Sequence, residues 1–506
     1  MGSTHGDVHE GRQAWSPPVA LLAGLICTLL LTGIEARAAG PTVRPNILLV
    51  LTDDMDAGLV ERMPNVKELI VRQGATFTRA YVNLPLCAPS RATILTGRYA
   101  QNTGVVGNNH RLFYQAGLPD RTVAVWLKAA GYRTGYFGKY LNDYPRPAPR
   151  GYVPPGWDYW LGRFAPGENA FGYEVNENGT AIRYGQDAAD YVTDLYAAKA
   201  LAFVEQAASD GVPFFLVLGV HAPHYPSIPA PRHAALFPDL MAPRPPSFDE
   251  ADVSDKPSFI RALGPLPPKR IAAIDREYRN RARSLQAVDE AVKALVGLLD
   301  ETGQLARTYL VFASDNGLIQ GLHRAGGKGL PYEEVIRVPL CVRGPGVAPG
   351  RVLEHMVGNA DLAPTFAEWA GAPVPDEVDG RSLAPLLAAG APGPEAWPQA
   401  YPITFTKSRS APIAPDWRGV RTRDHLYVEH GTGERELYDM RADTYQLLNL
   451  AGSADPALLA RLAQLTAELG SCSGAACRVL KQPTDVAGGV SRPSSAPPDL
   501  SVRAPR

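Results

Sequence analysis

The sequence predicts an α/β sandwich, in which helices flank a mainly parallel central sheet, together with a smaller C-terminal α+β domain. The first observation is a repeated unit of apolar strand, polar loop and amphipathic helix. The second is length, because 506 residues are more than one small core supports. The third is composition, since 48 glycines and 47 prolines suit a loop-rich enzyme better than a helical bundle.

The repeated units are recognised by their apolar periodicity and by the residues that end them. The apolar run 46–51 ends at Thr52-Asp53-Asp54, as expected of a buried strand that leads into a loop. Pro64 suits the first turn of a helix, and Gly74 suits its end. By the same criteria we expect strands at 46–51, 132–137, 214–219 and 308–313, and helices at 64–72, 122–130, 191–208 and 277–299.

Changes in composition divide the chain into domains. We expect a larger domain over 45–388, a linker rich in Ala, Pro and Gly, and a smaller domain over 396–480. The Ser/Pro-rich tail, 481–506, has too little apolar content to fold. A segment rich in Pro and Asp, 243–268, is expected either to lie near the functional site or to form a lid.

The N-terminal segment, 1–38, is typical of a signal peptide for export. Arg12 precedes an apolar run over 19–34, and Ala36-Arg37-Ala38 offers a small-x-small cleavage site. The run is slightly short for a bilayer span, which favours cleavage, while a membrane-tethered form is the alternative. We therefore expect a secreted, periplasmic or extracellular protein (lysosomal lumen in a eukaryote) with no stable membrane association after cleavage.

Charge and cysteine content narrow the classes of partner and compartment. The 50 basic and 51 acidic side chains remove any whole-protein electrostatic argument for nucleic-acid binding, so no nucleic-acid partner is expected. A few local cations are still enough to bind an anionic substrate. Cys341 lies in an apolar run and suits a core, whereas Cys472 and Cys477 are spaced for a short surface disulfide, whose formation stays open.

Acidic residues follow two of the predicted strands. Asp53 and Asp54 are adjacent carboxylates that repel each other unless a positive charge lies between them, and a divalent cation is the usual remedy. Taken alone, the pair is also typical of a turn or a helix cap. Asp315 and Asn316 follow a second strand, and the combined all-oxygen ligand set suits Ca²⁺ or Mg²⁺ rather than zinc.

The run from Cys87 to Gly97 carries the most chemical information in the chain. A lone cysteine is usually a small buried hydrophobe. The pattern Cys-x-Pro-Ser-Arg-x-x-x-Leu-Thr-Gly, however, resembles the signature of the sulfatases, and the resemblance extends from Pro45 to about Pro345. It implies an alkaline phosphatase-like fold. It also implies that a maturation enzyme oxidises Cys87 to Cα-formylglycine, whose hydrated aldehyde is the nucleophile.

The resemblance also implies roles for the other motifs. One cation, commonly calcium, would be held by Asp53, Asp54, Cys87, Asp315 and Asn316. The catalytic set would be Cys87, Arg91, Lys139, His224 and Lys328. Of these, Lys139, His224 and Lys328 match family positions that contact the sulfate, and His221 is a further substrate-binding candidate. A His-x-x-His pair such as His221 and His224 is also compatible with a zinc clasp, but no third nitrogen or sulfur ligand lies near in sequence.

Within the family the motif around Lys139 leans towards one branch. Gly-Lys-Tyr-Leu-Asn, 138–142, resembles the form in N-acetylglucosamine-6-sulfatases and extracellular heparan endosulfatases. Many other members have a histidine where this chain has Leu141, so the base that expels sulfate is open, with His221 or a water as candidates. The aromatic residues at 152, 157, 159 and 160 suit either stacking on a sugar ring or packing.

Together these features predict a secreted sulfatase that hydrolyses sulfate monoesters, with sugar 6-sulfates such as N-acetylglucosamine-6-sulfate as the implied substrates. The substrate would be a small molecule or a glycan. One alternative is a phosphonate or phosphate ester hydrolase of the same superfamily. The other is a catalytically inactive, calcium-dependent carbohydrate-binding protein.

Overall fold

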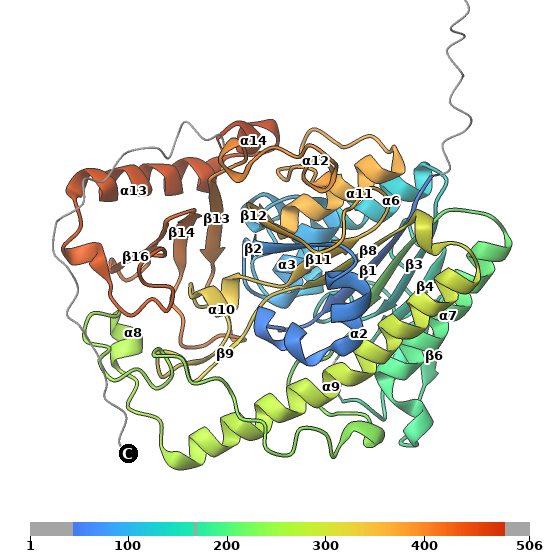
Figure 1. The fold of residues 1–506 in the computed structure, drawn as a ribbon, viewed down its shortest axis with the longest axis horizontal. Coiled ribbons are helices and arrows are strands. Elements are labelled where there is room, and N and C mark those ends of the chain that lie inside the picture. The colour runs from blue at the N-terminus through green and yellow to red at the C-terminus, as the bar shows by residue number, and fades with distance from the viewer. Residues whose placement is uncertain (1–43, 166–168, 481–506) are drawn as a thin grey trace, which may run out of the picture. The chain divides into compact units, whose positions relative to one another are not determined.

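The computed structural model describes residues 44–165 and 169–480. The predicted signal peptide, 1–38, and the predicted unfolded tail, 481–506, lie outside the described residues. Within the described part, ten strands form one mainly parallel sheet in the order β12-β2-β11-β8-β1-β7-β3-β4-β5-β6 (Figure 1). Their bounds are β1 Asn46–Thr52, β2 Ala75–Tyr81, β3 Arg133–Gly138, β4 Tyr159–Arg163, β5 Glu174–Glu177, β6 Thr180–Arg183, β7 Phe214–Gly219, β8 Thr308–Ser314, β11 Leu340–Arg343 and β12 Arg351–Gly358.

The central strands explain why the predicted motifs meet. β1 pairs in parallel with both β7 and β8, and β7 pairs in parallel with β3. Thr52 stands opposite Ser314, and Gly138 stands opposite Gly219. The four strands therefore end at the same level, and the residues that follow them lie at one edge of the sheet, where ligands collect in open α/β folds.

Helices cover both faces of this sheet (Figure 1). The alternating side chains of β1 divide between the two layers: Ile47 and Leu49 join the core beneath α3 and α11, and Leu48 and Val50 join the core beneath α7 and α9. Because β1 is buried on both faces, it is apolar throughout. The helices run α2 Pro64–Val66, α3 Cys87–Thr96, α4 Ala100–Thr103, α5 His110–Gln115, α6 Val123–Ala129, α7 Val192–Ser209, α8 Ser258–Arg261, α9 Pro268–Glu301, α10 Glu333–Ile336, α11 Leu362–Ala370, α12 Ala384–Leu387, α13 Pro456–Ser471 and α14 Ala475–Leu480.

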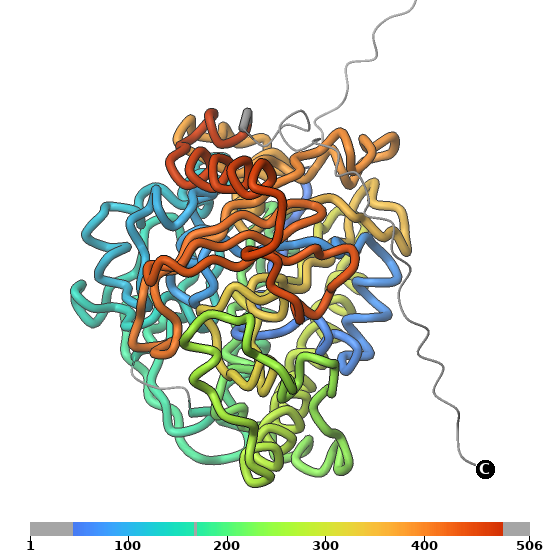
Figure 2. The backbone as a smooth tube through the Cα atoms, turned by 90° about the vertical axis from the view of Figure 1, so that its left-hand side faces the viewer, coloured from blue at the N-terminus to red at the C-terminus, as the bar shows by residue number. Residues whose placement is uncertain are grey.

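The C-terminal region forms a separate, antiparallel sheet in the order β13-β14-β15-β16. These strands run β13 Ala400–Phe405, β14 Trp417–Thr422, β15 His425–His430 and β16 Arg435–Asp439, and the short β9 Ile319–Gln320 and β10 Gly326–Gly327 form a two-stranded ribbon elsewhere. Figure 2 shows the C-terminal strands, in orange and red, with α13 along one side. Their apolar side chains share one core with residues of the larger region such as Leu86 and Tyr332. The predicted boundaries of the two domains stay predictions.

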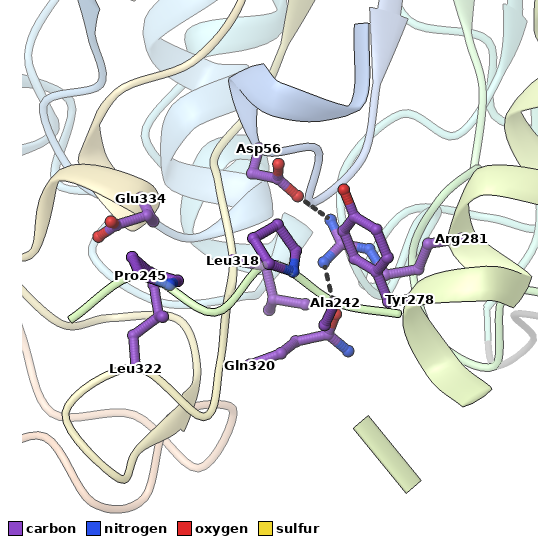
Figure 3. A pocket seen from close by; sticks show the side chains of 10 residues that line it. Asp56, Ala242, Pro245, Tyr278, Arg281, Leu318, Gln320, Leu322 and Glu334 are labelled. Atoms are coloured by element: carbon purple, nitrogen blue, oxygen red, sulfur yellow. Dashed lines mark hydrogen bonds and ion pairs between the residues drawn. The ribbon is translucent and has the colours of Figure 1, made fainter. Parts of the chain in front are cut away.

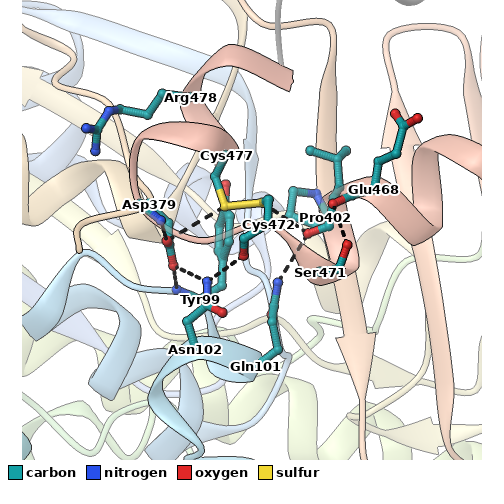
Figure 4. Close-up of a disulfide and its surroundings, with 12 residues drawn as sticks. Tyr99, Gln101, Asn102, Asp379, Pro402, Glu468, Ser471, Cys472, Cys477 and Arg478 are labelled. Carbon is teal, nitrogen blue, oxygen red and sulfur yellow. Dashed lines mark hydrogen bonds between the residues drawn. A yellow bond between two sulfur atoms is a disulfide. The ribbon is translucent and has the colours of Figure 1, made fainter. Parts of the chain in front are cut away.

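Cys472 and Cys477 form a disulfide, with Cα atoms 5.0 Å apart (Figure 4). Both cysteines are buried, so the bond is not on the surface as the sequence suggested. Beside it, the buried carboxylate of Asp379 accepts hydrogen bonds from the backbone N–H groups of Tyr99 and Gly474. This carboxylate therefore ties the segment after α3 to the C-terminal end of the described chain.

The predicted elements are present, and most of their ends lie within two residues of the predicted positions. The long helix α9 differs, because it begins nine residues earlier than predicted, at Pro268. The predicted helix 64–72 is a single α-turn followed by a π-helical turn, Lys67–Val71. Within residues 44–165 and 169–480, no helix has both the length and the apolar character that a membrane span requires.

Candidate active site

The predicted site residues gather at the carboxyl ends of the central strands. Asp53 and Asp54 directly follow β1, and Asp315 and Asn316 directly follow β8. Cys87 is the first residue of α3, whose N-terminus favours negative charge. All five side chains are buried, with at most 4% of their surface exposed. The register of the parallel strands and the position of the α3 N-terminus thus bring together residues that are up to 263 positions apart in the sequence.

The Cys87 sulfur lies against the aspartate pair. Its Sγ atom is 3.2 Å from Oδ1 of Asp53 and 3.8 Å from Oδ1 of Asp54. Oxygen atoms of the two carboxylates, the sulfur and a nitrogen of His224 lie within 4.8 Å of one another, a spacing that one metal ion can bridge. His224 was predicted from the sequence as a substrate contact rather than as a member of this group.

The backbone at Asp54 adopts a conformation that needs support. Its φ angle of 62° lies in the left-handed region, which Asp tolerates better than most residues. The Asp54 N–H donates to Oδ1 of Asp315 at 3.0 Å, and the Asp54 carbonyl accepts from Arg281 at 2.6 Å. These two bonds hold the turn that aims the Asp54 carboxylate at Cys87.

Two lysines reach the same carboxylates. Lys139, directly after β3, forms a short ion pair with Oδ2 of Asp53. Lys328, directly after β10, lies 2.5 Å from Oδ1 of Asp54 and 2.8 Å from the Cys87 sulfur. Both lysine side chains are about 93% buried, which distinguishes them from ordinary solvated surface lysines.

Arg91 lies one helical turn after Cys87 and is also buried. Its Nε donates to Oδ2 of Asp315 at 2.7 Å, and its Nη1 donates to the Lys139 carbonyl at 2.7 Å. Its Nη2 lies 3.9 Å from Asp53 and makes no hydrogen bond within the described chain. Arg91 therefore links α3 with the ends of β1, β3 and β8.

The amide of Asn316 shows that this group of residues fits a cation. Its Nδ2 donates to Oδ1 of Asp54 at 2.7 Å, while its Oδ1 is buried and has no hydrogen-bond partner among the described residues. A buried amide oxygen that accepts no hydrogen bond is uncommon, because its desolvation is not compensated. A hard cation bound to this oxygen would compensate for it. The carboxylates of Asp53, Asp54 and Asp315 add oxygen ligands of the kind that Ca²⁺ and Mg²⁺ prefer.

Burial and charge shift the proton affinities of these groups in different directions. Burial works to raise the pKa of Asp53, but Lys139 and the other nearby cations hold it well below its usual value. Burial, reinforced by the charge of Asp53, raises the pKa of Asp315 to about 6. Burial likewise raises the pKa of the Cys87 thiol well above its usual value, and Asp53 adds to the effect. An unmodified Cys87 is therefore a protonated thiol at neutral pH.

The two histidines occupy different positions. Nε2 of His224 lies 3.5 Å from Oδ2 of Asp54, and its Nδ1 lies 2.6 Å from the carbonyl oxygen of Tyr225. His221 instead lines a cavity of about 440 Å³ together with Lys139, Leu141 and Arg163, and its Nδ1 has no hydrogen-bond partner in the described part of the chain. Of the predicted site residues, His221 therefore lies to one side of the carboxylate group.

Arg281 and Asn108 are site residues that the sequence analysis missed. Arg281, on α9, supports the Asp54 carbonyl and lies 3.1 Å from Asp56 beside a cavity of about 130 Å³ (Figure 3). Its position on the buried stripe of α9, between Tyr278 and Leu285, is a sequence signal that would have found it. The Asn108 side chain accepts from the N–H of Ala88 at 3.0 Å, at the start of α3.

The four aromatic residues that suited either sugar stacking or packing lie against other aromatic rings of the protein. Trp160 is fully buried and Trp157 nearly so, and their rings contact Tyr136 with centroids 5.1 Å apart in both cases. The Tyr159 ring stacks on Phe137. Tyr152 is partly buried and packs edge-to-face against Tyr114. These contacts support the packing interpretation over the sugar-stacking one.

Comparison with known proteins matches this arrangement to one family. Residues 45–372 match the family model described as Sulfatase, and residues 321–472 match that described as N-sulphoglucosamine sulphohydrolase, C-terminal. The chain is 34% identical over 496 residues to N-acetylglucosamine-6-sulfatase from Homo sapiens, with 88% of each chain covered. It is 39% identical over 353 residues to an extracellular sulfatase SULF-1 homologue from Drosophila melanogaster, which covers 68% of this chain and 31% of the relative.

A solved structure extends the comparison to the fold. A protein whose structure was solved in complex with its substrate, D-glucosamine-2-N,6-O-disulfate, superposes with a TM-score of 0.71 at 26% identity. The match covers 84% of this chain and 97% of that protein. The alkaline phosphatase-like fold predicted from the sequence is thereby confirmed. Because the sulfatase match covers well over half of the chain, this protein belongs to the sulfatase family.

Proposed function

We propose that this protein hydrolyses sulfate monoesters to an alcohol and inorganic sulfate, with a nucleophile made from Cys87. One observation carries the proposal. Cys87 begins a helix, and its sulfur lies within 4 Å of two carboxylates and of the Lys328 ammonium group. A side chain in that position is in contact with both the residues that would bind a cation and those that would bind an anion.

The state of Cys87 decides whether the site works. The buried thiol holds its proton at neutral pH, because burial raises its pKa, so it is a weak nucleophile. We infer that a maturation enzyme converts it to Cα-formylglycine, whose hydrate offers two hydroxyl groups on one carbon. A serine at this position would lack the second hydroxyl group and hence the route by which sulfate leaves.

Positive charge is the second requirement, because the sulfur of a sulfate ester is surrounded by negative oxygens that repel a nucleophile. Arg91, Lys139 and Lys328 are buried around Cys87 and supply three fixed positive charges. In a buried site such charges act strongly and need little reorganisation as negative charge develops in the transition state. We propose that Lys139, Lys328 and His224 bind the oxygen atoms of the sulfate group.

A divalent cation would be held by Asp53, Asp54, Asp315 and Asn316, together with the modified Cys87, and we propose Ca²⁺ rather than Mg²⁺. When bound, it would neutralise sulfate oxygens and increase the acidity of a hydroxyl group of the hydrate. The Lys139 and Lys328 ammonium groups contact the same carboxylate oxygens in this structure. Cation binding would therefore compete with these ion pairs and release the lysines towards the substrate.

Two displacements complete the proposed reaction. One hydroxyl oxygen of the hydrate attacks sulfur and loses its proton, the bond from sulfur to the alcohol oxygen breaks, and His224 or a lysine protonates that oxygen. The remaining hydroxyl group then loses its proton, a carbonyl bond forms, and the bond from carbon to the sulfate oxygen breaks. The candidate bases for this second step are His221, whose ring is neutral because burial lowers its pKa, and a water.

We propose that the substrates are sugar 6-sulfates, including N-acetylglucosamine-6-sulfate. We also propose that the protein is exported from the cell. The human and Drosophila relatives are named for N-acetylglucosamine-6-sulfate and for an extracellular sulfatase, respectively. The chain spans only about a third of the Drosophila relative, so the comparison supports the chemistry more than the site of action.

Two experiments test the proposal. Peptide mass spectrometry of the segment spanning Cys87, from active protein, should find the aldehyde in place of the thiol; fully active protein that retains sulfur would contradict it. Comparison of kcat/KM for aryl sulfate and aryl phosphonate esters should favour the sulfate. A large preference for the phosphonate would indicate the alternative hydrolase, and unimpaired sugar binding without any turnover would indicate a binding protein.

A further inference from the structure

Arg163, the last residue of β4, carries a positive charge into the protein and forms no ion pair within residues 44–165 and 169–480. Its side chain is buried, with 4% of the residue exposed. Nη2 donates to the carbonyl oxygen of Asn169 at 2.6 Å, and the guanidinium lies 5.1 Å from the centre of the Tyr173 ring. Nε and Nη1 have no hydrogen-bond partner, and no carboxylate lies within ion-pair distance, among the described residues. The Arg163 charge therefore has no counter-charge among the described residues.

Two further buried polar groups lie near Arg163. The Tyr196 hydroxyl interacts with the Arg163 guanidinium, and Nδ1 of His221 is buried and has no hydrogen-bond partner within residues 44–165 and 169–480. The Tyr196 and His221 rings lie 6.2 Å apart. The Arg163 charge opposes protonation of His221, which places the guanidinium in the same neighbourhood.

Arg163 and His221 line a cavity that adjoins the catalytic centre. The cavity has a volume of about 440 Å³, and Lys139, Asn142, Arg163 and His221 are among its lining residues. Lys139 also contacts Asp53, so the cavity and the carboxylate group share one side chain. A sugar whose sulfate ester lies at Cys87 would extend towards this space.

A buried guanidinium without a counter-charge is costly, because the desolvation of the charge is not repaid by an ion pair. The Tyr173 ring compensates in part. A planar guanidinium with free N–H groups matches the geometry of a carboxylate or a sulfate group, both of which accept two parallel hydrogen bonds. The missing partner is therefore best supplied by a ligand.

We propose that Arg163 binds a second oxyanion, a sulfate or a carboxylate, carried by the same sugar substrate whose sulfate ester is cleaved at Cys87. Arg163 is then a specificity residue that selects sugars with two anionic groups. This inference rests on the proposed sulfatase function, because it takes the position of the reacting ester from it.

Steady-state kinetics of Arg163→Gln test the inference. For N-sulfoglucosamine 6-sulfate, which has two anionic groups, KM should rise at least tenfold. For 4-nitrophenyl sulfate, which has one, kcat/KM should stay within twofold of the wild-type value. For the doubly charged sugar, the KM of Arg163→Lys should lie between those of the wild type and Arg163→Gln, because lysine keeps the charge and loses the planar pair of donors. Equal losses on both substrates, or no loss on either, would overturn the proposal.

Arg150→Gln is the matched control, since Arg150 is exposed and pairs with Glu174 on neighbouring β5. It removes the same charge from the same region and should change neither KM. If the wild type fails to cleave any sulfate ester, the proposed function fails, and calorimetry then tests Arg163 separately. In that case N-sulfoglucosamine 6-sulfate should bind Cys87→Ala at least tenfold more tightly than the double variant with Arg163→Gln. Equal affinity, or no binding to either, would refute the assignment.

Discussion

Replacement of Arg91 by methionine tests whether the catalytic centre depends on internal charge balance. The substitution keeps much of the apolar volume of the side chain and removes its charge. Asp315 then loses the donor at 2.7 Å, and Asp53 loses a positive charge at 3.9 Å. Both carboxylates are fully buried, so water cannot replace the guanidinium.

The geometry sets the size of the effect. At an effective dielectric constant of about 20, two unit charges 2.7 Å apart attract by about 6 kcal/mol. Part of this lost attraction is offset, because the variant no longer incurs the desolvation cost of a buried guanidinium. Breaking a buried ion pair by removal of one partner typically costs about 3–5 kcal/mol of unfolding free energy, and we expect a loss in that range.

The loss of unfolding free energy in Arg91→Met should be larger at high pH than at low pH. Burial and Asp53 already raise the pKa of Asp315 to about 6 from 3.8, so the folded state binds a proton more tightly than the unfolded state. The contribution of Asp315 to stability is therefore greatest at low pH and falls as pH rises through 6. Without Arg91 the pKa rises further, so the penalty of Arg91→Met should be large at pH 8 and much smaller at pH 5.

Urea unfolding of metal-free protein, followed by tryptophan fluorescence at both pH values, measures this difference. Arg98→Met is a useful control, because Arg98 lies just after the same helix and forms no ion pair among the described residues. A loss below about 1 kcal/mol for Arg91→Met at pH 8, or an equal loss at both pH values, would refute the reasoning.

Three further predictions concern activity and stability. Lys328→Met should lower kcat by about 100-fold or more, because it removes a positive charge next to the nucleophile. Mass spectrometry should show that Cys87 is still converted in this variant. A normal kcat would show that Lys328 is not a catalytic residue. Chelation should abolish turnover, and added Ca²⁺ should restore it and raise the Tm; full activity in protein shown by elemental analysis to be metal-free would contradict the cation site. Burial lowers the pKa of His110 below its usual 6.5, so the unfolded chain takes up a proton that the folded protein excludes, and stability falls as pH drops below 6.5. His110→Phe should reduce the loss of unfolding free energy between pH 7 and pH 5, by at most about 1.4 kcal/mol per pH unit, and an unchanged slope would show that His110 does not contribute.

The catalytic group could be predicted from the sequence because its members follow regular elements. Asp53, Lys139, His221 and Asp315 each lie within two residues of a strand end, and parallel strands in register bring such ends together. The apolar strands were visible because a strand buried on both faces is apolar along its whole length. Local sequence and general sheet geometry were sufficient there.

The supporting residues could not be predicted in the same way. Arg281 reaches the Asp54 carbonyl from a helix 227 positions later, so its role depends on how α9 crosses the sheet. Arg163 ends the short strand β4, which was not predicted, and neither were β5 beside it and β6 beyond that, whose burial alternates weakly. Likewise, β2 and β12 pair through residues that are 276 or 277 positions apart, and neither strand has a continuous apolar run.

The balance of charges in the centre connects these observations. Asp53, Asp54 and Asp315 face three cationic side chains, Arg91, Lys139 and Lys328, so the buried group is close to neutral when its carboxylates are ionised. A sulfate ester that entered alone would add a negative charge beside Arg91, Lys139 and Lys328, whose charges are already paired with carboxylates. A divalent cation alone would leave an excess of positive charge in the same buried volume. Each ligand therefore reduces the electrostatic cost of binding the other, and by linkage the two should bind cooperatively. The lysines that pair with Asp53 and Asp54 in this structure are consequently the groups whose partners must change when the substrate binds.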